Sequence, residues 1–195
     1  MAKGTGTISL GNRRTTLGAS AKGTRAAFHD RRRETQKKGT RLEDLIDYSS
    51  LLLFIELPSN RELLRVVRGM MEGLTDVMGF SPRECRSVTI AVDEALANIV
   101  RHSYQARPGQ PIEICCRRIQ GQLNKRKRAG LEITLADYGP AIDYAKLRGR
   151  KLDDIRPGGL GLHFIRQSMD TMKFTRAGRT NRLRLVKYLP EPKSS

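Results

Sequence analysis

The chain has 195 residues, of which 38% are hydrophobic, and it carries a formal net charge of +17. This length suits one domain with appendages, no apolar run approaches the roughly 20 residues of a membrane span, and the basic N-terminus lacks the apolar stretch of a secretory signal. Three cysteines, two of them adjacent at 115 and 116, form no disulfide framework and no spaced metal motif, so we expect buried thiols in a cytoplasmic protein without a membrane anchor.

The positive charge is concentrated at the N-terminus. The first 41 residues hold 11 Lys and Arg against two acids and carry +9, which leaves +8 for the other 154 residues. Their Gly-, Thr- and Ser-rich composition, without periodicity, predicts disorder, and both a solvated tail and a tail that touches nucleic acid fit it. We therefore expect a basic tail at 1–45, one domain at 46–190 and a short C-terminal tail at 191–195.

The first half of the domain predicts one strand and two helices. Residues 50–58, SLLLFIELP, form a short apolar run closed by a proline, which is typical of a buried strand. Apolar residues at helical spacing predict a helix over 61–78. The sequence SPRE at 81–84 has the form of a capping box with proline at the first helical position. We expect the second helix to run from there to about Tyr104.

The second half predicts mainly hairpins. We expect, in chain order, a strand at 111–119, a solvated basic hairpin tip at 121–130, a strand at 131–137, an irregular segment at 138–158, a short helix at 160–170, and two strands at 171–176 and 182–189 that pair across the turn AGRTN. This order predicts an α/β (α+β) two-layer sandwich, with a mixed, mostly antiparallel sheet covered on one face by helices.

The predicted second helix carries polar residues among apolar ones, in the sequence AVDEALANIVRHSY at 91–104. Glu94 and Asn98 are four residues apart, so their side chains share a face and can converge on one ligand. A carboxamide oxygen suits Mg²⁺, and a nearby carboxylate suits a general base; a plain solvated face remains the alternative. His102, one turn further on, fits a structural role near the helix end.

Asp137 ends the strand 131–137 and shares its side with Leu131, Ile133 and Leu135. A carboxylate on an apolar side is costly unless a group donates to it, and the exocyclic amino group of adenine is one such donor. A carboxylate that caps the turn at Gly139 explains the residue equally well.

The third motif is RPGGLGLHFI at 156–165, with Gly158, Gly159 and Gly161 at a helix start. Glycines let backbone N–H groups approach a phosphate, and a helix N-terminus favours anions. A simple hinge is the alternative. Basic residues in the segment before it would neutralise phosphate charge or lie in solvent.

These three motifs, in this order, resemble the N-box, the G1 box (LADYGPAID, 135–143) and the G2 box of the GHKL ATPases. The compact length, the N-box ending in His-x-Tyr and the GGLGL sequence are most similar to the bacterial anti-sigma-factor serine/threonine kinases. The resemblance spans about 51–189.

The resemblance implies a Bergerat-type fold that binds ATP with Mg²⁺ and phosphorylates a serine on a STAS-class anti-sigma-factor antagonist. It implies Glu94 as general base, Asn98 as Mg²⁺ ligand and Asp137 as the adenine-binding acid. The other residues that it assigns to the nucleotide pocket are Gly139, Ala141, Gly158, Gly159, Leu160 and Gly161. Ala141 stands where many relatives have a second G1 glycine, which implies a stiffer pocket entrance or an altered nucleotide affinity.

A second interpretation is a non-catalytic ATP-binding module that sequesters a partner. The sequence leaves open whether a sigma factor is bound directly, and the resemblance suggests a homodimer. A third interpretation is a nucleic-acid contact through the basic tail, which is compatible with the kinase interpretation.

Overall fold

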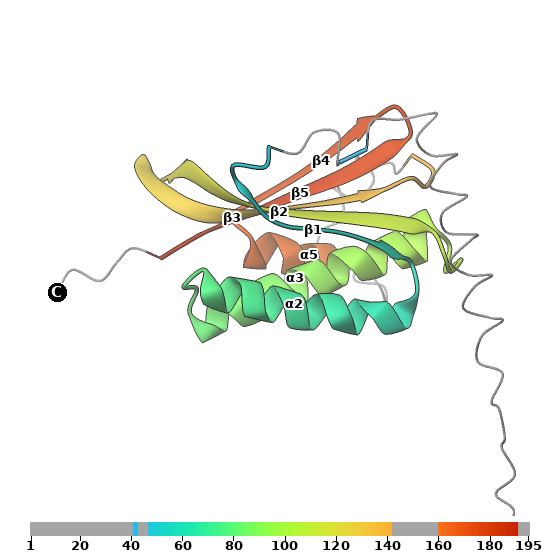
Figure 1. The fold of residues 1–195 in the computed structure, drawn as a ribbon, viewed down its shortest axis with the longest axis horizontal. Helices are drawn as coiled ribbons and strands as arrows, with labels where there is room; N and C mark the ends of the chain where they lie inside the picture. The colour runs from blue at the N-terminus through green and yellow to red at the C-terminus, as the bar shows by residue number, and fades with distance from the viewer. Residues whose placement is uncertain (1–40, 43–46, 142–159, 191–195) are drawn as a thin grey trace, which may run out of the picture.

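The computed structural model describes residues 41–42, 47–141 and 160–190 (Figure 1). The elements in chain order are β1 (Leu51–Pro58), a 3₁₀ turn η2 (Arg61–Leu63), α2 (Leu64–Val77), α3 (Pro82–Asn98), a π-helical turn η3 (Ile99–Ser103), β2 (Pro111–Leu123), β3 (Arg126–Asp137), α5 (Leu160–Ser168), β4 (Thr171–Ala177) and β5 (Thr180–Tyr188).

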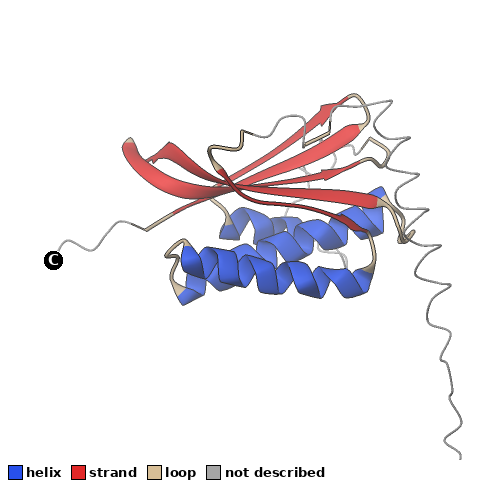
Figure 2. Cartoon of the chain, in the orientation of Figure 1, coloured by secondary structure: helices blue, strands red, loops and turns tan. Residues whose placement is uncertain are grey.

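The described strands form one sheet in the order β1-β2-β3-β5-β4, and each pairing is antiparallel. Helices α2, α3 and α5 lie together on one face of this sheet (Figure 2). The predicted two-layer sandwich is therefore confirmed. Among the described residues, no helix is both long and apolar enough to cross a membrane.

The core fills the space between the sheet and the helices. Alternate strand residues point to this side, and the helices contribute apolar residues at three- and four-residue steps. The most deeply buried members include Val67, Met71, Val88, Val92, Leu96, Ile112, Ile114, Leu131, Ile133, Leu135, Ile165 and Leu185.

The adjacent cysteines lie on opposite faces of β2, as expected for consecutive strand residues. Cys116 belongs to the core under the helices, whereas Cys115 packs with Leu42 and Ala136 on the other face. Burial raises the pKa of the Cys116 thiol to about 12. Both are free and buried, which confirms the prediction of buried thiols for this pair, whereas the free Cys85 is only partly buried.

The two hairpins are tighter than the sequence predicts. β2 and β3 remain paired up to Leu123 and Arg126, so the turn is only Asn124–Lys125, whose φ angles of 53° and 66° match a two-residue hairpin turn. The two strands stay paired through the charged residues of the predicted tip, because backbone hydrogen bonds do not require an apolar face. Similarly, β5 begins at Thr180, two residues before the predicted Arg182.

The predicted long helix up to Tyr104 is interrupted near its end. α3 ends at Asn98, and the N–H of Tyr104 donates to the carbonyl of Ile99, five residues earlier, at 2.9 Å. A π-turn contains one more residue than an α-turn, and this shift leaves His102 exposed while Ser103 and Tyr104 are buried. The helical segment thus ends close to the predicted Tyr104, but its last five residues form a π-turn.

The capping box at the start of α3 is present. Glu84 N–H donates to Ser81 Oγ at 3.4 Å, and Ser81 N–H donates to Glu84 Oε2 at 2.9 Å. Together with Pro82 at the first helical position, these bonds fix where α3 begins. The helix that carries Glu94 and Asn98 is thus anchored at its N-terminal end.

We expect Ser81→Ala to lower the free energy of unfolding by about 1 kcal/mol, because it removes this cap. Urea denaturation measures the effect. Ser87→Ala, within the same helix, is the matched control and should change stability little, since alanine favours a helix interior. Equal loss in both variants would contradict a specific capping role.

Candidate functional site

Helix α3 brings Glu94 and Asn98 against the first turn of α5. Both residues lie near Gly161, which is buried. A Cβ atom added to Gly161 would lie 2.5 Å from Glu94 Oε2 and 3.6 Å from Asn98 Nδ2. Contacts as short as the first one essentially do not occur, so an added Cβ atom would displace the Glu94 carboxylate from its place beside the start of α5. The structure therefore brings together three of the residues predicted from the sequence.

The side chains of Glu94 and Asn98 are partly exposed. Within the described part of the chain, neither makes a side-chain hydrogen bond or an ion pair. The negative charge of Glu94 is favoured close to the N-terminus of α5, where backbone N–H groups point outward. With respect to the described residues, the polar atoms of both side chains are therefore open to a ligand.

Asp137 lies at the end of β3 and is only 4% exposed. Its Oδ1 atom accepts three hydrogen bonds: from Ser103 Oγ, from Gly139 N–H at 3.0 Å and from Asn181 Nδ2 at 2.8 Å. Burial raises the pKa of this carboxyl group, and the three hydrogen bonds oppose that rise. The group is a buried acid supported from three different elements.

The other carboxylate oxygen of Asp137 is in a different situation. No residue in the described ranges donates a hydrogen bond to Oδ2. Oδ2 is also not among the fully buried side-chain atoms that lack a partner in the described residues, so it keeps some exposure. In this part of the chain it is therefore an acceptor open to a ligand, on a carboxylate whose position is fixed by the bonds to Oδ1.

Gly139 fits tightly against the π-turn. A Cβ atom at this position would lie 2.1 Å from Ser103 Oγ and 2.7 Å from Ser103 O. Because one of these atoms belongs to the backbone, no side-chain movement would make room. The sequence leaves open the alternative that Asp137 only caps the turn. That role explains the hydrogen bond from Gly139 N–H, but it explains neither the burial of Asp137 nor its other two donors.

Asn181 and Arg176 are site residues that the sequence analysis missed. Asn181 also donates to Pro140 O at 3.1 Å, and Arg176 donates to Asn181 Oδ1 and to Gly139 O at 3.3 Å. A signal for Asn181 existed, because it shares strand parity with two core leucines of β5. It was assigned to the turn because β5 was predicted to begin later.

The remaining predicted residues lie apart or outside the described ranges. Ala141 is exposed just after the turn, and His102 points to solvent. Leu160 begins α5, while Gly158, Gly159 and the basic segment before them fall outside the described residues. Among the residues that the structure does describe, no group of three or more His, Cys, Asp or Glu side chains could hold a metal ion.

The family of the chain follows from comparison with known proteins. Residues 57–187 match the model of the histidine kinase-like ATPase domain. This segment contains the α3 face, the Asp137 turn and the start of α5. The chain belongs to this family, as the resemblance of its motifs to the GHKL ATPases indicates.

Within the family, the chain is similar to proteins named serine-protein kinase RsbW. It is 30% identical to the one from Bacillus cereus (strain AH820) over 127 residues, which cover 61% of this chain and 74% of the relative. It is 27% identical to the one from Bacillus pumilus (strain SAFR-032) over 130 residues, or 63% and 76% of the two chains.

Among solved structures, the SiaB-SiaC complex from Pseudomonas aeruginosa contains a chain that matches with a TM-score of 0.51 at 16% identity. The match covers 75% of this chain and 95% of that one. This similarity supports the fold.

The raised pKa of Asp137 leads to a pH-dependent prediction. Since the native chain holds this proton more tightly than the unfolded chain, the contribution of Asp137 to the free energy of unfolding falls as the pH rises through the raised pKa. We expect Asp137→Asn, which keeps an Oδ1 acceptor, to be more stable than wild type at neutral pH. This advantage should vanish as the pH falls below the raised pKa.

Urea denaturation at neutral and acidic pH measures this difference. Asp76→Asn is the control, because Asp76 is exposed on α2 and its replacement should give no such pH-dependent gain. A variant at position 137 that is less stable than wild type at neutral pH would contradict the account of a strained buried carboxylate.

Proposed function

We propose that the protein is a cytoplasmic, ATP-dependent serine/threonine kinase that acts as an anti-sigma regulatory factor. Its substrate would be a serine on a STAS-class anti-sigma-factor antagonist. The observation that supports this most is the position of Glu94 and Asn98 beside Gly161 at the start of α5, where neither side chain makes a hydrogen bond or ion pair with a described residue. The similarity to serine-protein kinases supports the same activity.

The adenine end of the nucleotide would bind at the Asp137 turn. Oδ2 of Asp137 is the acceptor that the exocyclic amino group requires, and its position is set by the bonds to Oδ1. A ligand that covered this acceptor without donating to it would leave it unpaired, which disfavours any such ligand. The turn is therefore suited to select adenine over bases that present a carbonyl group at that position.

The triphosphate end would lie near the start of α5. Asn98 offers one amide oxygen, a hard ligand of the kind Mg²⁺ takes, and Mg²⁺ commonly completes its shell with phosphate oxygens and water. When bound, the ion would neutralise phosphate charge during transfer. The first-turn N–H groups of α5 would add positive potential at the same place.

Glu94 would act as the general base. Its carboxylate would take the proton of the substrate serine as the serine oxygen forms a bond to the γ-phosphorus. The bond between that phosphorus and the bridging oxygen would break, and ADP would leave with the electron pair. Positioned proton transfer of this kind contributes roughly 10²–10⁴-fold to a rate.

We expect Glu94→Gln to lower phosphotransfer by about 10²–10⁴-fold while ATP affinity stays within a few-fold of wild type. The assay incubates the full chain with Mg·ATP and a STAS-domain protein from the same organism, and intact-protein mass spectrometry detects the added phosphoryl group. Glu72→Gln, at an exposed position on α2, is the control and should transfer as wild type does.

The outcomes separate the two interpretations. Unchanged transfer in Glu94→Gln would remove the proposed mechanism. If wild type binds ATP and the STAS-domain protein but transfers nothing, the non-catalytic module that sequesters its partner is the correct function.

A further inference from the structure

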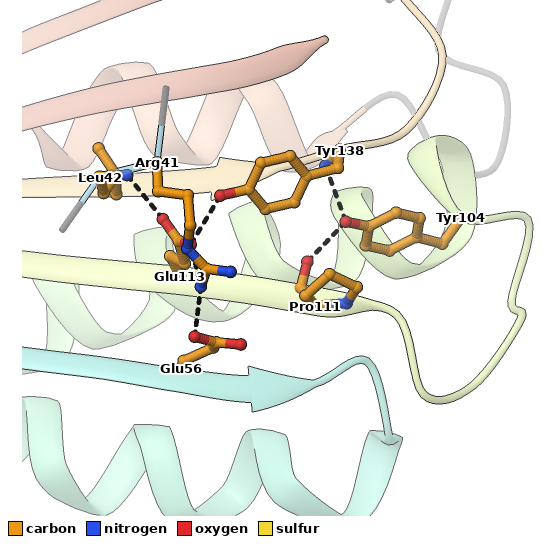
Figure 3. Close-up of polar contacts among 7 residues, drawn as sticks. All are labelled: Arg41, Leu42, Glu56, Tyr104, Pro111, Glu113 and Tyr138. Carbon is orange, nitrogen blue, oxygen red and sulfur yellow. Dashed lines mark hydrogen bonds and ion pairs between the residues drawn. The ribbon is translucent and has the colours of Figure 1, made fainter. Parts of the chain in front are cut away.

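Arg41 is a buried arginine on the sheet face opposite the helices. Its side chain is 1% exposed, and its guanidinium lies between the carboxylates of Glu56 on β1 and Glu113 on β2, the latter at 2.5 Å (Figure 3). Glu113 is completely buried, and it also accepts a hydrogen bond from the N–H of Leu42 at 2.8 Å. Two consecutive residues that precede the predicted domain are therefore docked into an acidic pocket of the sheet.

A cation buried in this way is tied to its two acids. Removing charged groups from water is costly unless each is paired, and removal of one partner leaves the others buried and uncompensated. Without Arg41, the buried Glu113 would lose the ion pair at Oε1 and keep only the hydrogen bonds from Leu42 and Tyr138. Arg41 thus contributes to the orientation of the Glu113 carboxylate.

Glu113 in turn holds the residue next to the predicted adenine-binding acid. Tyr138 Oη donates to Glu113 Oε1 at 2.6 Å. On its other side, Tyr138 N–H donates to Tyr104 Oη at 2.8 Å, and that hydroxyl donates to Pro111 O at 2.6 Å (Figure 3). Burial raises the pKa values of both tyrosines, so both hydroxyls stay protonated and able to donate.

Tyr138 lies between Asp137 and Gly139, and it is fixed through both its side chain and its backbone. A continuous set of contacts therefore leads from Arg41 through Glu113 and Tyr138 to the turn that orients Asp137.

We propose that Arg41 is a positioning residue for the nucleotide site: its docking between Glu56 and Glu113 holds Tyr138 and raises the affinity of the Asp137 turn for the adenine nucleotide. This inference rests on the proposed function, since it concerns the same site. By linkage, nucleotide binding strengthens the docking of Arg41 by the same factor, and any partner that binds the chain with Arg41 undocked weakens nucleotide binding.

The test compares the full-length wild type with Arg41→Ala, Arg41→Lys and Tyr138→Phe, using calorimetric titration with Mg·ATP below the unfolding temperature. We expect Arg41→Ala to bind roughly 5- to 150-fold more weakly, the range of typical coupling between sites, with smaller losses for the other two. Arg184→Ala is the control. It breaks an ion pair with Glu132 on the same sheet face, away from the turn, and should bind as wild type does.

Chemical rescue distinguishes positioning from general stabilisation. Methylguanidinium, at concentrations that do not denature the chain, should enter the vacated pocket of Arg41→Ala and restore ATP affinity, whereas sodium chloride at equal ionic strength should not. Restoration by both salts, or equal weakening in Arg184→Ala, would overturn the proposal.

Hydrogen exchange at the amides of Tyr138 and Gly139 is measured without nucleotide. It therefore tests whether Arg41 orders the turn, whether or not the protein is a kinase. We expect faster exchange in Arg41→Ala than in Arg184→Ala, even if wild type were to bind no ATP. If Arg41→Ala fails to fold, Tyr138→Phe decides, because it leaves the ion pairs intact. Wild-type affinity and wild-type exchange in that variant would overturn the proposal.

Discussion

The site is built around one buried carboxylate. Burial of Asp137 at the end of β3 favours the neutral acid, and hydrogen bonds to the carboxylate oppose this. The donors come from η3, from its own turn and from β5, and all three bind the same oxygen. Three elements distant in sequence must be in register for this to happen. The sheet order β1-β2-β3-β5-β4, which makes β5 the neighbour of β3, is what supplies Asn181.

The helix that carries the catalytic candidates is coupled to this carboxylate by the π-turn. Glu94 and Asn98 lie on α3, and Ser103 follows on η3 in one continuous helical segment. The extra residue in the turn directs Ser103 inward, where it donates to Asp137, and brings its backbone against Gly139. One helical segment thereby places the proposed base, the proposed metal ligand and the support of the proposed adenine-binding acid.

The motifs show how much of this site was predictable. Glu94, Asn98 and Gly161 were found from helical spacing and a glycine cluster, and the structure brings them together. Strand parity placed Asp137 on the apolar side of β3. Ser103 could not be found in this way, because a π-turn changes the periodicity on which the prediction depends.

The fold was predicted from alternating apolar patterns and the capping box, since these are local. The contribution of Asn181 depends on where β5 begins and on its register with β3, which local patterns do not determine. Arg41 was hidden for another reason. It follows a stretch rich in basic residues, and such a composition predicts exposure to solvent. Arg41 is buried only because the sheet brings Glu56 and Glu113 together as its partners.

The central claim is that Asp137 accepts a hydrogen bond from the amino group of adenine. Parallel calorimetric titrations of the full chain with Mg·ATP and Mg·ITP test it most directly, because inosine carries a carbonyl group where adenosine carries the amino group. The account predicts that ATP binds and that ITP binds roughly 10- to 100-fold more weakly, as expected for losing a hydrogen bond to a charged acceptor. Equal affinities, or no heat on adding ATP, would contradict it.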